Sequence, residues 1–432
     1  MKTLNFLGLN RKEIASGIYF SKITDARFKH NRVSFCLLTR LDENAASANA
    51  VVPKILTNSC RDYPDLRALN KRLSSLYAAR LSESVGNLGD TQYIDISIKT
   101  ADDRYALEGE SILSEGIDIL AGCLLEPLTE NGAFKESVTE NEKRSQIDQI
   151  EAELNEKRVY VIKRTLELLC AGEPAAVPPN GTVEGVKKVT PLTAFAAYKK
   201  LLESARIEII CVGCNDFSVA ETTLTRAVSR LKRNNTEDCV SKPGALKPET
   251  LYREEKMNVN QSKMALGFKA AGDDVDALAV MTKIYGGSAT SKLFENVREK
   301  MSLCYYCLAK FDANKRIMLA ECGVESGDIE KARKEILAQL DLMKTGGFTD
   351  EEMSHAGLSL QNDLKTVGDS LSGMAKWYLG HIYMRDVVTP EQAIARYLAV
   401  TRERIIKAAE SVSLDTVYVL TERDTDRKGR RK

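Results

Sequence analysis

The chain has 432 residues, of which 43% are hydrophobic and 28% are charged, proportions typical of a globular protein with two or three domains. These proportions exclude a wholly disordered, collagen-like or disulfide-scaffold chain. The 62 basic and 61 acidic residues leave a formal net charge of +1. No overall charge therefore draws the chain to nucleic acid or to an anionic membrane surface, and we expect neither as a partner.

Hydrophobic periodicity predicts a chain of alternating strands and helices. In chain order we expect strands at 32–41 and 91–100, a helix at 110–125, a long charged helix at 134–170, strands at 206–214, 262–270, 304–312 and 316–324, a helix at 329–347 and a strand at 416–423. The glycine pair that ends the helix at 329–347 is suited to a C-cap.

A linker divides the chain into two halves. Residues 234–251 are polar, contain Pro243 and Pro248 and show neither the helical nor the strand period. We therefore expect an N-terminal domain at 1–233 and a C-terminal domain at 252–432.

The two halves resemble each other. The segment VSFCLLTRLDENAASANAVVPKIL (33–56) is echoed by MALGFKAAGDDVDALAVMTKIYGG (264–287), each a strand, an acidic turn and an apolar helix. Near the end of each half, Val-Thr-Pro (189–191 and 388–390) precedes an amphipathic helix, with threonine suited to the N-cap and proline to the first turn. This order predicts two similar α+β domains, each an antiparallel sheet flanked by helices.

The ten cysteines are scattered through apolar segments, which indicates buried thiols in a reducing compartment. Two CxxC pairs, Cys211/Cys214 and Cys304/Cys307, leave a metal or redox protein as a minor alternative. Both pairs lie in predicted strands, where residues i and i+3 point to opposite faces and do not readily share a metal. Since the first twenty residues hold no continuous apolar run and no stretch could span a membrane, we expect a cytoplasmic protein.

The segment YGGSATSKLFENVREKMSLCYYCLAKFD (285–312) resembles the second-domain motif of the pitrilysin/insulinase-type zinc peptidases, especially the short bacterial forms related to mitochondrial processing peptidase. The residues that carry the resemblance are Gly286, Gly287, Leu293, Phe294, Arg298, Glu299, Lys300 and Tyr305. Ser302 and Cys304 depart from the small Gly-Leu-Ala run that is usual there. The resemblance extends over the whole chain in domain order and size, and it implies the duplicated processing-peptidase fold.

In that family a helix of the first domain carries HxxEH, whose histidines bind zinc with a distant glutamate while the inner glutamate activates water. The matching positions here are Asn49, Val52 and Pro53, and neither valine nor proline can bind zinc or accept a proton. The third-ligand position is expected near Asp148 and Gln149. The resemblance therefore implies a degenerate zinc motif, no metal in this chain and zinc only in a partner chain.

Other catalytic patterns are not favoured. The three histidines, His30, His355 and His381, have no metal-ligand spacing and are poorly placed for a Ser-His-Asp site. The GGSATSK run lacks the second glycine of a phosphate loop, so nucleotide binding is not expected.

The second half of the family's site is present in the sequence. The resemblance implies that Arg298 and Tyr305, seven residues apart, hold the substrate carbonyl and the developing oxyanion. A planar guanidinium and a phenol O–H are suitable donors for that role. Gly286 and Gly287 would let the backbone approach a substrate closely.

Two functions from different classes follow. The first is a non-catalytic subunit of a heterodimeric zinc peptidase, which binds extended peptide and supplies Arg298 and Tyr305 to the zinc site of a paralogous partner. The second is a catalytically dead scaffold or peptide-binding protein that forms homodimers.

Overall fold

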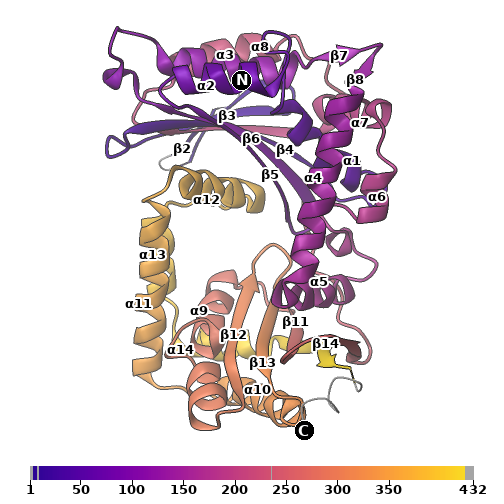
Figure 1. Ribbon diagram of the computed structural model, residues 1–432. Helices are drawn as coiled ribbons and strands as arrows, with labels where there is room; N and C mark the ends of the chain where they lie inside the picture. Colours follow the sequence, from indigo (N-terminus) through magenta and orange to yellow (C-terminus); the bar gives the residue numbers. More distant parts are fainter. Residues whose placement is uncertain (1–2, 7–8, 235, 424–432) are drawn as a thin grey trace. The chain divides into compact units, whose positions relative to one another are not determined.

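A computed structural model describes residues 3–6, 9–234 and 236–423 (Figure 1). The chain divides into two compact units that are not contiguous in sequence. Unit 1 is formed from Met1–Glu151, Val177–Val240 and Val367–Thr389, and unit 2 from Ala152–Ala176, Ser241–Thr366 and Pro390–Lys432.

The elements of unit 1 centre on a seven-stranded sheet in the order β1-β2-β3-β9-β4-β6-β5. Its strands are β1 Thr3–Phe6, β2 Leu9–Ala15, β3 Ile18–Thr24, β4 His30–Arg40, β5 Arg80–Leu88, β6 Thr91–Ala101 and β9 Arg206–Gly213, and β7 Thr129–Glu130 with β8 Ala133–Phe134 forms a small separate ribbon. Its helices are α1 Ala46–Leu56, α2 Leu66–Ser75, α3 Ile112–Leu125, α4 Glu136–Asn155, α6 Val183–Lys187, α7 Pro191–Ser204, α8 Ser218–Val228 and α12 Leu371–Met384, with a 3₁₀ turn at Asp103–Tyr105.

Unit 2 is built on a five-stranded sheet in the order β10-β14-β11-β13-β12. Its strands are β10 Leu251–Met257, β11 Ser262–Ala270, β12 Cys304–Asp312, β13 Ile317–Val324 and β14 Val412–Glu422. Its helices are α5 Lys157–Leu169, α9 Val275–Gly286, a π-helix at Leu293–Lys300, α10 Ile329–Lys344, α11 Asp350–Val367, α13 Pro390–Leu398 and α14 Arg402–Glu410, with a 3₁₀ turn at Pro174–Ala176.

Both sheets are covered on both faces. In unit 1, α3 and α8 lie on one face and α12 on the other (Figure 1), which explains why every residue from Ile207 to Gly213 of β9 is buried. In unit 2, α9, α10 and α14 pack on one face, and α5 packs on the other against β11 and β14. These contacts also explain the interleaved units, since α5 packs with the second sheet and α12 with the first.

The α+β prediction is confirmed, and the internal repeat takes a definite topological form. Five strands of each sheet follow the same spatial order, β3-β9-β4-β6-β5 in unit 1 and β10-β14-β11-β13-β12 in unit 2. In both, the strand that is last in sequence lies between the first two. Each insertion creates one parallel pair, β3 with β9 and β10 with β14, in an otherwise antiparallel sheet. Hydrophobic alternation cannot distinguish parallel from antiparallel neighbours. The sequence pattern therefore could not indicate these two parallel pairs, and antiparallel sheets were expected.

The expected helix at 134–170 is interrupted. It divides into α4 and α5 at Glu156, whose backbone is extended (φ −76°, ψ 96°) and whose side chain accepts a hydrogen bond from the Arg158 N–H. The sequence has no Gly or Pro at this break, because a glutamate serves as the cap. The prediction of one continuous helix was therefore wrong. In the described part of the chain, no helix is long and apolar enough to cross a membrane.

Candidate functional site

The three residues expected at the zinc-motif positions, Asn49, Val52 and Pro53, lie on α1 in the core of unit 1. Asn49 and Val52 are 5% and 2% exposed, and Pro53 is buried inside the helix. The amide of Asn49 donates from Nδ2 to Oε1 of Gln92 at 3.0 Å. Gln92 in turn donates to the carbonyls of Ala46 at 3.2 Å and Pro179 at 2.6 Å. The polar groups at this position are therefore satisfied by one another, and they tie α1 to β6.

This set of side chains does not fit a zinc ion. Val52 packs in the apolar cluster under the sheet, and a pyrrolidine ring stands where a ligand imidazole would be needed. Across the described ranges, no group of three or more His, Cys, Asp or Glu side chains could hold a metal ion.

The residues expected near the third-ligand position lie on α4. Asp148 and Gln149 lie on the exposed side of α4, whereas its buried side carries Lys143 and Gln146. Gln146 donates from Nε2 to the carbonyl of Asn180 at 2.9 Å. The periodicity of α4 could have identified Gln146 as the inward residue, although an amide there offers zinc only a weak oxygen ligand.

The second-domain motif forms a different kind of site. Gly286 ends α9, and Gly287 follows as its C-cap. A β-carbon on Gly286 would lie 2.7 Å from both the backbone nitrogen and the Cβ of Ala309 on β12. Only glycine lets the end of α9 lie this close to the strand, so the glycine pair sets the distance between helix and sheet.

Arg298 lies on the π-helix, which is closed by a hydrogen bond from the Met301 N–H to the Asn296 carbonyl at 3.1 Å. Its guanidinium carbon stands 4.5 Å from the centre of the Phe294 ring, and its Nε lies 3.6 Å from Oε1 of Glu299. The side chain is 38% exposed. These are weak surface contacts, and they leave most of the five N–H donors of the guanidinium accessible.

Tyr305 is the extra residue of a β-bulge at the start of β12. Cys304 pairs with Val324 and Tyr306 with Gly323 on β13, so Tyr305 has no partner of its own. Its side chain is 67% exposed, and its hydroxyl lies 3.4 Å from Oε1 of Glu325. The bulge directs the phenol away from the core and into solvent.

The bulge also corrects the expectation for Cys304 and Cys307. Because the extra residue shifts the alternation by one, both side chains enter the same apolar cluster rather than opposite faces. A hydrogen bond from Cys307 lowers the pKa of the Cys304 thiol, and Arg298 adds to this effect. Cys307 lies opposite Cys322, and hydrogen bonds to both neighbouring thiols, together with burial, raise its own pKa. Strand alternation therefore does not separate the two thiols of this CxxC pair, and that prediction was wrong.

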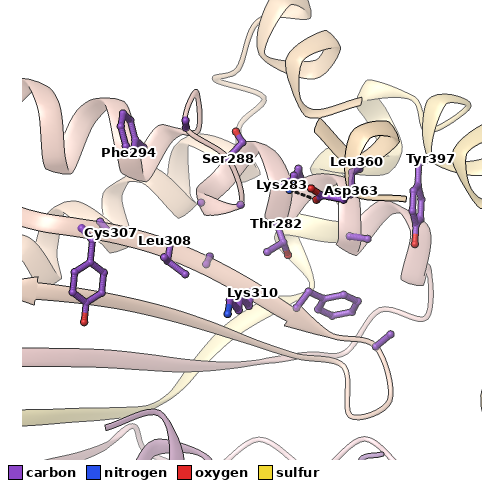
Figure 2. A pocket seen from close by; sticks show the side chains of 18 of the residues that line it. Thr282, Lys283, Ser288, Phe294, Cys307, Leu308, Lys310, Leu360, Asp363 and Tyr397 are labelled. Atoms are coloured by element: carbon purple, nitrogen blue, oxygen red, sulfur yellow. Dashed lines mark hydrogen bonds and ion pairs between the residues drawn. The ribbon is translucent and has the colours of Figure 1, made fainter. Parts of the chain in front are cut away.

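A cavity of about 770 Å³ lies beside these residues, wholly within unit 2 (Figure 2). Gly286, Gly287 and Arg298 line it, whereas Tyr305 lies just beyond it, next to the lining residue Tyr306. The structure thus brings three of the four expected binding residues to one cavity. The rest of the wall was not predicted from the sequence, and it includes Lys283, Leu308, Lys310, Phe311, Leu360, Asp363 and Tyr397. Three of these residues, Leu360, Asp363 and Tyr397, come from α11 and α13, far from the motif in sequence.

Comparisons with known proteins agree with this picture. Residues 188–357 match the family described as the peptidase M16 inactive domain. The chain is 25% identical over 405 residues to the probable inactive metalloprotease YmfF of Bacillus subtilis (strain 168), covering 91% of this chain and 93% of that protein. A conserved protein of Enterococcus faecalis V583 has the same fold, with a TM-score of 0.87, 24% identity and coverage of 96% of this chain and 99% of that one.

The peptidase M16 inactive domain of Pseudomonas fluorescens also shares the fold, with a TM-score of 0.77 and 14% identity, and the match covers 96% of this chain and 99% of that one. In sequence and in fold, the chain is therefore similar to the pitrilysin/insulinase-type (M16) peptidases, and Asn49, Val52 and Pro53 are the residues expected at the positions of their zinc motif.

Proposed function

We propose that this protein is a non-catalytic subunit of a two-chain zinc peptidase of the cytoplasm. It binds an extended polypeptide substrate and supplies Arg298 and Tyr305 to a zinc site carried by a paralogous partner chain. Zinc is needed only in that partner, where it would supply the polarised water.

The observation that carries this proposal is the contrast between the two halves of the family's site. The α1 positions are filled by groups that pack in the core or bond to Gln92, and they offer nothing to a metal. Arg298 and Tyr305 instead keep exposed polar heads next to a cavity and a sheet edge. A side chain that is solvated and bound only by weak contacts remains available for a ligand.

The sheet edge explains how a polypeptide would be held. In the part of the chain that the structure describes, β12 pairs with β13 on one side and with no strand on the other. Such an edge presents unpaired N–H and C=O groups at every second residue, to which an extended peptide can add as a further strand. Arg298 would then donate to a substrate carbonyl, and its charge would favour an oxygen that becomes negative.

The test combines the purified chain with an HxxEH-bearing homologue from the same organism. Alone, the chain should bind no stoichiometric zinc and should not cleave a quenched fluorescent peptide. Native mass spectrometry of the mixture should show a complex of both chains, with peptidase activity well above that of either alone.

Matched substitutions distinguish a catalytic contribution from assembly. Arg298→Ala should lower turnover of the complex about 100-fold and Tyr305→Phe about tenfold, with assembly unchanged. Lys300→Ala on the same π-helix and Tyr252→Phe on edge strand β10 are the controls, and neither should alter turnover. If both test variants retain full turnover, or if the chain forms only homodimers that bind peptide, the scaffold function replaces this proposal.

A further inference from the structure

The cavity of unit 2 follows the edge of β12 and does not lie on one face of the sheet. Its wall includes every residue from Tyr306 to Phe311. Successive side chains of a strand point to opposite faces, so a cavity on a single face would be lined by alternate residues. An unbroken run of lining residues therefore means that the cavity reaches the backbone along the free edge.

The lining is apolar in its interior. Its walls are formed by apolar side chains from four elements: Val275 and Ala279 on α9, Phe294 on the π-helix, Leu308 and Phe311 on β12, and Leu360 on α11. Figure 2 shows Leu308 on the strand and Leu360 on a helix, and both line the cavity. With a volume of about 770 Å³, the cavity has room for a leucine or an aromatic side chain.

The charged residues of the wall have one predominant sign. The three cations Lys283, Arg298 and Lys310 line the cavity, against the single carboxylate of Asp363. Asp363 is already paired, since its Oδ2 lies 2.6 Å from Nζ of Lys283 (Figure 2). Lys310 is exposed on the edge strand, and Nε of Arg298 lies 3.6 Å from Oε1 of Glu299. The wall therefore carries a net positive charge around an apolar interior.

We infer that this cavity binds a large apolar side chain of an extended peptide whose flanking residues are acidic. The peptide pairs with the edge of β12, its leucine or aromatic side chain enters the cavity, and its carboxylates lie near Arg298 and Lys310. A β12 edge six residues long, about 20 Å, matches a peptide of about the same number of residues. This inference rests on the proposed function, because it specifies which polypeptides the binding subunit selects.

Peptide binding to the full chain tests it by fluorescence anisotropy. The reference probe is a capped, fluorescein-labelled heptapeptide with a central phenylalanine and two glutamates on each side. Three further probes replace the phenylalanine with alanine, replace the glutamates with lysines, or carry N-methyl groups on alternate amides to prevent strand pairing. The reference probe should bind at least about tenfold more tightly than each of the others at low salt, and added salt should reduce its advantage over the lysine probe.

Two substitutions locate the binding. Lys310→Glu should weaken binding of the reference probe about tenfold and strengthen that of the lysine probe. Ala279→Phe, at a half-buried position of α9, should fill the cavity and weaken binding of the reference probe and of the lysine probe, since each carries the central phenylalanine. Lys331→Glu on α10, where the side chain is 71% exposed, is the matched control and should leave binding unchanged.

The possible failures are distinguishable. If all peptides bind alike, or if Lys310→Glu and Ala279→Phe have no effect, this inference is wrong while peptide binding by the subunit stands. If no peptide binds and the complex with the zinc-bearing homologue is inactive, the proposed function fails as well.

Discussion

Replacing Gly286 with alanine tests whether the end of α9 lies as close to β12 as the structure shows. The added methyl carbon would lie 2.7 Å from the Ala309 backbone nitrogen and 2.8 Å from Cδ1 of Leu293. The Ala309 nitrogen is part of the β12 backbone and the Leu293 side chain is fully buried, so neither can yield easily and helix and strand must move apart. Overpacking of this kind costs about 1–3 kcal/mol, against a gain of up to about 1 kcal/mol from the higher helix propensity of alanine.

We therefore expect Gly286→Ala to lower the free energy of unfolding by about 1–2 kcal/mol, or the melting temperature by roughly 2–8 °C. Gly380→Ala provides the matched control, because a β-carbon there would meet nothing within 4 Å and the residue lies inside α12. This control should be stabilising by up to about 1 kcal/mol. The two substitutions lie in different units, since Gly380 belongs to unit 1 and Gly286 to unit 2.

Urea unfolding followed by far-UV circular dichroism measures both changes. Trp377, the single tryptophan, lies on α12, so its fluorescence reports on unit 1 and should respond to the control variant more than to Gly286→Ala. The reasoning is refuted if Gly286→Ala is as stable as the natural chain, or if the two alanine variants shift stability in the same direction.

Three further substitutions test other contacts by thermal and urea unfolding. Asp415→Ala should cost about 3–5 kcal/mol, because Asp415 is fully buried and its Oδ1 bonds to Nζ of Lys247 at 2.5 Å. Burial raises the pKa of Asp415, but the hydrogen bonds from Lys247 outweigh this effect and the net pKa is lowered. The stabilisation is therefore present at neutral pH and is lost as the pH falls below 3.8. An unchanged acid unfolding transition in the variant would contradict this. Val52→Glu should cost about 3 kcal/mol or more and bind no zinc, since it places a carboxyl in the core, whereas Ala48→Glu at a half-buried position of the same helix should cost much less. Thr190→Ala should cost about 1 kcal/mol by removing the cap of α7, and a loss below a few tenths would refute the capping role.

Sequence reasoning worked best where hydrophobic patterns are strong and local. The strands expected at 91–100 and 304–312 are found as β6 and β12 with nearly the same bounds. The threonine and proline expected to begin a helix at 190–191 do so, with Thr190 as the cap of α7. These features depend on side chains close together in sequence, which is why periodicity and capping chemistry indicate them.

The site was only partly predictable because its geometry depends on pairing between distant segments. The motif gave Arg298 and Gly286, which line the cavity, but the bulge at Tyr305 is a matter of register with β13. That register placed Cys304 and Cys307 on one side, against the rule of simple alternation. Lys283 and Asp363 meet across 80 positions of sequence, and no local pattern indicates such a pair.

The repeated strand order has a consequence for biosynthesis. In each sheet, the strand made last must enter between two that were made first, β9 between β3 and β4 and β14 between β10 and β11. A nascent chain that has emerged only as far as α14 therefore still has β10 cut off from the other strands of its sheet. Folding of the second unit must wait until β14 has been synthesised, and loss of β14 should leave a chain prone to aggregation rather than a shortened domain.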